Sequence, residues 1–126
     1  MGSDTVDGLD PAAGRFLQRI PARTSEGFRI IPVDELISAV AHREYVHLTT
    51  CDGERHTLPY ALKDLHAKLD PDRFVRLSRN TLVNLDFVRQ ILAGRNGLLS
   101  ISLSNGDRHG VSRRRSRELR RLLLHL

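Results

Sequence analysis

The most informative part of this chain is the stretch Phe74-Val75-Arg76-Leu77-Ser78-Arg79-Asn80-Thr81-Leu82-Val83-Asn84. It places arginine and small polar residues between apolar positions, so we expect core packing at both ends to fix a short irregular segment. A loop held in this way presents its side chains in a defined geometry, which is what contact with a base edge requires. A second arginine cluster follows near the end of the chain, at Ser112-Arg113-Arg114-Arg115.

The basic charge of the chain is concentrated in its second half. Residues 1–70 carry 8 basic and 11 acidic side chains, whereas residues 71–126 carry 12 basic and 4 acidic ones. All of those 12 are arginine, whose planar guanidinium suits phosphate groups and guanine edges. Such a field attracts nucleic acid or another polyanionic surface.

Length and composition predict one domain. With 126 residues the chain can bury a single modest core. Its only cysteine, Cys51, cannot form an internal disulfide, which favours a reducing cytoplasm. No signal peptide is visible, and no apolar run approaches the ~18 residues of a membrane helix. Residues 1–19 are interpreted as a linker or flexible tail, with a helix over 12–19 as the weaker alternative, and residues 20–126 as the folded domain.

Turn chemistry and alternation predict a mostly β (α+β) fold. Asp52-Gly53 and Asn105-Gly106 are typical of tight hairpin turns. Leucines at helical spacing predict a short central helix, which begins near Pro59 and ends at Asp70-Pro71, and a C-terminal helix that begins near Ser112. A single helical turn is expected over 33–36. The strands are expected over 28–31, 37–42, 45–50, 54–58, 99–104 and 108–111.

The arginines at the start of the predicted C-terminal helix are unfavourable unless an anion is present. Ser112 suits the N-cap, but each exposed cation in a first helical turn costs about 0.3–1 kcal/mol. A phosphate would bring the backbone N–H groups and the guanidinium groups together around one anion. A solvated arginine run is the alternative. For an arginine in the 76–80 segment, the alternative is a surface ion pair with Asp72 or Asp86.

Four segments, in the same order, resemble the LytTR DNA-binding domain, the output domain of LytR/AlgR-type bacterial response regulators. The resemblance runs from about residue 20 to 123. It implies an antiparallel β-sheet domain that inserts loops, not a recognition helix, into successive major grooves of double-stranded DNA. It also implies transcription regulation, binding to paired direct repeats as a homodimer at least on DNA, and a sensor or receiver domain elsewhere in a two-component system. The segments are Ile31-Pro32-Val33-Asp34-Glu35-Leu36, Glu44-Tyr45-Val46-His47-Leu48, the stretch over 74–84, and Gly110-Val111-Ser112-Arg113.

The resemblance assigns DNA contact to Tyr45, Arg79 and Arg113. The sequence departs from the family pattern at Ser78, where His is common, and at Asn80, where Ser is usual. It also has Arg43-Glu44 where Gly-Asn is frequent. These departures lie at the expected contact surface, so the recognised DNA sequence stays open; Asn80 could itself read adenine. The candidate DNA-binding residues are Arg43, Tyr45, Ser78, Arg79, Asn80, Arg113, Arg114 and Arg115.

Other chemistry has little support in the sequence. His42 and His47 are expected on opposite faces of a strand, with no cysteine pair to complete a metal site. No phosphate-binding glycine loop, nucleophile elbow or catalytic carboxylate pair is visible, so neither an enzyme nor a cofactor is expected.

Single-stranded RNA and a protein are the two alternative partners to duplex DNA. Single-stranded RNA usually stacks on exposed aromatic side chains, and the chain offers only Tyr45 and Tyr60, with four phenylalanines expected to be mostly buried. The alternative from another class is a protein-interaction or dimerisation module that uses the basic second half and the leucine-rich last helix. No membrane contact is expected.

Overall fold

The computed structural model describes residues 16–124, with side chains as far as Leu122, and it contains two antiparallel sheets. The larger sheet has the strand order β2-β1-β5-β4-β3-β7-β6, and the smaller one β10-β9-β8. The strands of the larger sheet are β1 (Arg19–Thr24), β2 (Gly27–Pro32), β3 (Leu36–His42), β4 (Tyr45–Thr50), β5 (Arg55–Leu58), β6 (Phe74–Ser78) and β7 (Thr81–Asn84). Those of the smaller sheet are β8 (Val88–Ala93), β9 (Leu99–Leu103) and β10 (Arg108–Gly110).

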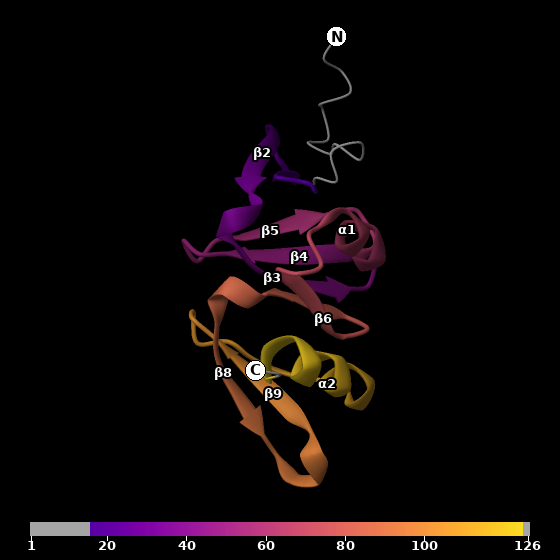
Figure 1. The fold of residues 1–126 in the computed structure, drawn as a ribbon. Coiled ribbons are helices and arrows are strands. Elements are labelled where there is room, and N and C mark those ends of the chain that lie inside the picture. The colour runs from indigo at the N-terminus through magenta and orange to yellow at the C-terminus, as the bar shows by residue number, and fades with distance from the viewer. Residues whose placement is uncertain (1–15, 125–126) are drawn as a thin grey trace.

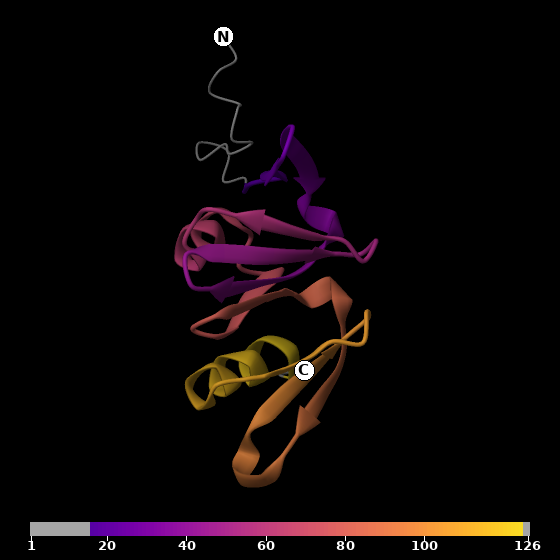
Figure 2. The same cartoon turned by 180° about the vertical axis from the view of Figure 1, so that it is seen from behind.

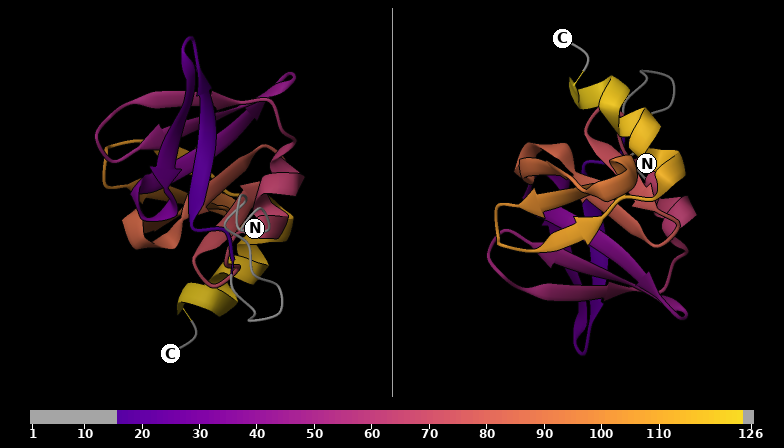
Figure 3. Two further views of the ribbon diagram at one scale, coloured as in Figure 1. Left: turned by 90° about the horizontal axis from the view of Figure 1, so that it is seen from above. Right: turned by 90° about the horizontal axis from the view of Figure 1, so that it is seen from below.

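Two α-helices pack against this β framework (Figures 1 and 2). They are α1 (Leu62–Lys68) and α2 (Arg113–Leu119), and α2 continues as the π-helical turn η6 (Arg120–Leu124). The view from below in Figure 3 shows α2 beside the smaller sheet, and the view from above shows the β1–β2 hairpin (indigo) projecting from the larger one. Three 3-10 turns complete the fold: η3 (Val33–Glu35), η4 (Leu85–Phe87) and η5 (Arg95–Gly97).

The apolar residues form two cores, because successive side chains of a strand point to opposite faces. The first core holds the α1 residues Leu62 and Leu65 together with Phe74 of β6. The second holds Leu77 of β6, residues of the smaller sheet, and Leu119 of α2. Strand β6 therefore contributes to both cores, and its polar residue Arg76 falls on the same side as Phe74.

Most of the predicted elements are confirmed, including the mostly β class with a central and a C-terminal helix. Gly53 and Gly106 have φ values of +85° and +93°, as the predicted hairpin turns require. The central helix begins at Leu62 instead of Pro59, since Ala61 is still extended with ψ 145°.

The prediction of an irregular segment within residues 74–84 was wrong. Phe74 pairs with Asn84 and Ser78 with Thr81, so the stretch is the β6–β7 hairpin with Arg79 and Asn80 as a two-residue turn. A register shift between Arg76 and Ser78 interrupts the alternation, which hides the strand from a period-2 analysis. Strands β1 and β8 were not predicted either.

The folded region begins before the predicted start at residue 20. Leu17 is buried and its N–H donates to the Lys68 carbonyl at 2.8 Å, while Arg19 opens β1. Residues 16–18 are not helical, which is against the alternative helix over 12–19 in its described part. The remainder of the predicted tail, residues 1–15, lies outside the described residues.

The expectation that the phenylalanines are mostly buried needs correction. Phe74 is buried, but Phe28 is 64% exposed, and the other two phenylalanines are half-buried. On the last helix Leu119 is buried whereas Leu122 is 44% exposed. The side chains beyond Leu122 lie outside the described residues.

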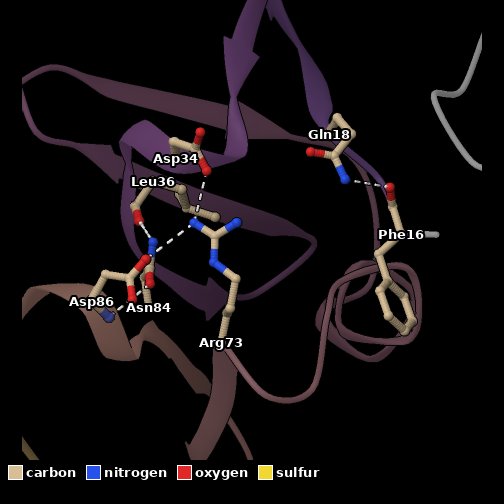
Figure 4. A network of polar contacts seen from close by, with 7 residues as sticks. All are labelled: Phe16, Gln18, Asp34, Leu36, Arg73, Asn84 and Asp86. Carbon is tan, nitrogen blue, oxygen red and sulfur yellow. Dashed lines mark hydrogen bonds and ion pairs between the residues drawn. The ribbon is translucent and has the colours of Figure 1, made fainter.

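A polar network fixes the base of the β6–β7 hairpin (Figure 4). Asn84, which is fully buried, donates to the Leu36 carbonyl at 2.9 Å and accepts from the Asp86 N–H at 2.9 Å. Arg73 contacts Asp34 at 2.8 Å and Asp86 at 3.2 Å. These contacts tie the start of β6 to the 3-10 turns η3 and η4, so the base of the hairpin is fixed at the edge of the larger sheet.

Candidate nucleic-acid interface

Three segments that carry predicted contact residues lie along one side of the molecule: the β3–β4 turn, the β6–β7 turn and the start of α2. This side is at the right in Figure 1 and at the left in Figure 2. The Ala41 N–H donates to the Asn80 carbonyl at 2.8 Å, which joins the two turns. The Ser112 N–H donates to the Leu77 carbonyl at 2.8 Å. This bond fixes the start of α2 against β6, at a residue that precedes Arg79 by two positions in the sequence. Segments far apart in the chain are thus held together by backbone hydrogen bonds.

The β3–β4 turn presents Arg43 and Tyr45. His42 pairs with Tyr45, leaving Arg43 and Glu44 as a two-residue turn. Arg43 has a φ of 59°, a left-handed conformation that costs a non-glycine residue about 1–2 kcal/mol. Both side chains are exposed, with Tyr45 48% accessible. An arginine kept at a strained turn position, where glycine would be easier, is typical of a functional site.

The side chain of Arg76 fixes the backbone of the β6–β7 turn. Its Nε donates to the Ser78 carbonyl at 3.1 Å, and a terminal nitrogen donates to the Arg79 carbonyl at 2.6 Å. The Ser78 hydroxyl accepts from the Asn80 N–H at 3.2 Å, so this side chain shapes the turn. The side chains of Arg79 and Asn80 are exposed. The turn therefore has a fixed backbone and two outward polar side chains.

The start of α2 presents two exposed arginines and one that is partly engaged. The Ser112 hydroxyl caps the helix by accepting from the Arg115 N–H at 3.2 Å, as predicted. Arg113 and Arg114 are exposed, and neither forms an ion pair with another of the described residues. Arg115 contacts Glu118 at 3.3 Å.

An open hollow of about 380 Å³ lies between the β3–β4 turn, the β6–β7 hairpin and the start of α1. We call it the basic hollow. It brings together the predicted residues Arg43, Tyr45 and Arg79, but not the arginines of α2. Among the lining residues outside the predicted set are Tyr60, Lys63 and Arg76, each with a side chain that can donate a hydrogen bond. No local sequence pattern points to Tyr60 or Lys63, because their approach to the turns depends on how α1 packs on the sheet.

Positive charge accumulates behind this side of the molecule. Burial, followed by the charge of Arg115, lowers the pKa of Arg76. Burial likewise lowers the pKa of His66 on α1, and the charges of Arg76 and Arg115 lower it further. Both α1 and α2 contact β6, so these charges lie close together, and Glu118 of α2 acts on the pKa of His66 in the opposite direction.

The prediction about the two histidines needs correction. His42 and His47 do not face opposite sides: they come from paired strands, their ring centroids are 6.2 Å apart, and both line one groove. The prediction was wrong because it treated them as members of a single strand. Across residues 16–124, no group of three or more His, Cys, Asp or Glu side chains could hold a metal ion.

No helix in that range is long and apolar enough to cross a membrane.

The family model of the LytTr DNA-binding domain matches residues 26–124. The chain belongs to this family. The match includes the β3–β4 turn, the β6–β7 turn and α2, the three segments that carry the predicted contact residues. The resemblance inferred from the sequence is confirmed.

Relatives of the LytTr domain in this chain include three bacterial proteins. The positive alginate biosynthesis regulatory protein of Pseudomonas aeruginosa is 36% identical over 120 residues, 92% of this chain and 48% of that protein. The CO-responsive transcriptional regulator RcoM of Rhodospirillum rubrum is 31% identical over 114 residues, 90% of this chain and 48% of that protein. The sensory transduction protein LytT of Bacillus subtilis is 25% identical over 105 residues, 83% and 43% respectively. The chain spans about half the length of these relatives.

A solved LytTr DNA-binding domain from Bacillus cereus has the same fold. It aligns with a TM-score of 0.77 at 23% identity, covering 87% of this chain and 98% of that one. The predicted LytTR-like antiparallel architecture is therefore confirmed.

Proposed function

We propose that this LytTr domain binds double-stranded DNA sequence-specifically through its turns and the start of α2, as part of a bacterial transcriptional regulator. Arg79 and Arg113 are the base readers in the major groove, since each is an exposed guanidinium on a backbone fixed by hydrogen bonds. The secondary contacts to bases or phosphates are Arg43, Tyr45, Asn80, Arg114 and Arg115, and Ser78 acts mainly by shaping the turn.

The observation that carries this proposal is the convergence of arginines without carboxylate partners. Arg43, Arg79, Arg113 and Arg114 come from three separate segments on one side of the molecule, and within the described residues none of them forms an ion pair. An uncompensated cluster of this kind repels itself in the free protein and is stabilised by a polyanion. Arg115 is the exception, because Glu118 partly neutralises it.

The wider arrangement belongs to the same proposal. Two copies would bind paired direct repeats, and a sensor or receiver domain would precede or follow this domain in a longer cytoplasmic protein. The family and the half-length coverage of the relatives support such an arrangement.

A selection from random duplexes, followed by mobility shifts of the selected site, tests the proposal. We expect a defined motif, with repeat spacing if two copies bind. In a salt titration log K should fall against log[salt] by about 0.9 for each phosphate neutralised. Absence of duplex binding, or a flat salt response, would contradict the proposal and favour the protein-interaction module instead.

A further inference from the structure

The basic hollow is more strongly cationic than a contact surface for base edges requires. It is lined by four basic side chains, Arg43, Lys63, Arg76 and Arg79, against one carboxylate, Glu44. These residues come from the β3–β4 turn, α1 and the β6–β7 hairpin, so the charge is brought together by the fold and not by a run in the sequence. A concave surface of this composition suits an anion that can be approached from several sides.

Both tyrosines of the chain line the same hollow. Tyr45 is 48% exposed and Tyr60 is 40% exposed, although they come from different elements. Each phenol carries a hydroxyl that can donate a hydrogen bond, and tyrosine is among the side chains that contact phosphate oxygens in protein–DNA complexes. The hollow therefore combines point charges with neutral donors.

Arg76 contributes a charge that the protein does not neutralise. Its guanidinium donates to two backbone carbonyls, and among the described residues it forms no ion pair with a carboxylate. Burial and the charge of Arg115 act against this cation, as its lowered pKa indicates. An anion in the hollow would relieve that repulsion.

We propose that the basic hollow seats a phosphate of the DNA backbone beside the bases contacted by Arg79, with Lys63 and Tyr60 as contacts from the α1 side. The proposal rests on the proposed function, because Arg43, Tyr45 and Arg79 of the hollow belong to the DNA-binding set. A phosphate fits better than a base edge on this side, since lysine is a compact point charge without the planar fork that reads guanine. The volume of about 380 Å³ leaves room for the adjoining sugar. The seat would fix the register of the β6–β7 turn on the duplex.

The two lysines of the chain offer a matched test. Both are exposed and both belong to α1, but Lys63 lines the basic hollow and Lys68 does not. We expect K63Q to weaken binding to the selected duplex and to random duplex by the same factor, about 5- to 10-fold, and to reduce the salt slope by about 1. K68Q should leave the slope at the wild-type value. Y60F should cause a smaller uniform loss, about threefold, because it removes one hydrogen bond.

A duplex with single uncharged methylphosphonate linkages locates the seat. The uncharged linkage is moved along the selected site one phosphate at a time. At one position it should weaken DNA binding by the wild type and by K68Q, but cause no further loss of affinity in K63Q. That pattern would show that Lys63 and this phosphate act on each other. Thermal unfolding of each variant is the check on folding. Substitution of an exposed lysine should leave the midpoint of unfolding unchanged.

The outcomes separate this proposal from the one on which it rests. If the wild-type protein binds no duplex, the proposed function fails, and the phosphate seat fails with it. If the wild type binds its site but K63Q and K68Q behave alike, the seat alone is overturned. A K63Q loss confined to the selected sequence would overturn it as well, since that would make Lys63 a base contact.

Discussion

The base and the tip of the β6–β7 hairpin use arginine in opposite ways. At the base, Arg73 contacts Asp34 at 2.8 Å and Asp86 at 3.2 Å, and the hydrogen bond with Asp34 is the main cause of its raised pKa (Figure 4). Nearer the tip, the hydrogen bonds of the Arg76 side chain within residues 16–124 go to two backbone carbonyls, and burial lowers its pKa. The two residues are three positions apart in the sequence.

This difference separates an arginine that holds the fold together from arginines that are left for a partner. The charge of Arg73 is compensated inside the molecule, so it does not add to the outward field. Arg76 and Arg79 form no ion pair within the described residues, so an external anion can compensate their charges. We therefore expect substitutions at the base to change stability, and substitutions at the tip to change DNA binding.

The largest effect is expected at the base, from Asn84→Ala. The substitution removes the hydrogen bonds to the Leu36 carbonyl and from the Asp86 N–H, and leaves buried polar groups unpaired. We expect a loss of about 2–3 kcal/mol in the free energy of unfolding, measured by urea denaturation. The folded fraction should keep its affinity for the selected duplex. A variant of normal stability with impaired DNA binding would reverse the assignment of base and tip.

At the tip, Arg79→Ala tests base contact directly. We expect it to weaken binding to the selected site by about 1–3 kcal/mol and to change binding to random duplex little. Equal losses on both would make Arg79 a phosphate contact. Arg114→Ala is the companion variant: it should weaken binding to all sequences alike, and a loss confined to the selected site would contradict its secondary role.

A subtler change at the tip is Arg76→Lys, which keeps the charge but loses the planar fork that holds two carbonyls. We expect about 1 kcal/mol less affinity for the selected site, with an unchanged salt slope. Backbone amide exchange at residues 78–80 should become faster without any DNA present. Arg89→Lys, an exposed arginine on β8, is the control and should leave both measurements unchanged. Unchanged exchange in R76K would show that the turn does not depend on this side chain.

Much of the fold could be predicted because its signals are local. The Asp52-Gly53 and Asn105-Gly106 turns and the leucine spacing of α1 each determine structure within a few residues. The β6–β7 hairpin was missed because a register shift beside Arg76 interrupts its alternation, and because each face of β6 packs against a different core. Pairing with a distant strand stabilises such a segment, and sequence periodicity does not report that pairing.

The candidate site was predictable only where the family pattern covers it. The pattern points to Arg79 and Arg113, but it says nothing of Tyr60 or Lys63. These two residues reach the basic hollow through the packing of α1 on the sheet. Asp86 was a possible ion-pair partner for an arginine of the 76–80 segment. It does form an ion pair, but with Arg73 at the hairpin base, so Arg79 has no ion-pair partner among the described residues.

The smallest expected effect is a pH dependence at His66, on the α1 side of the tip. Burial first, and then Arg76 and Arg115, lower the pKa of His66 from its ordinary value of 6.5. As the pH falls through about 6.5, the unfolded chain binds a proton at this residue before the folded one does, so the His66 contribution reduces stability until the pH reaches the lowered folded pKa. H66Q should remove that contribution and lose less stability than wild type between about pH 7.5 and pH 5.5. Denaturation of both proteins across this range measures the difference, in which the other histidines cancel. Parallel stability curves would show that the pKa of His66 is the same in the folded and unfolded states, and would contradict the prediction.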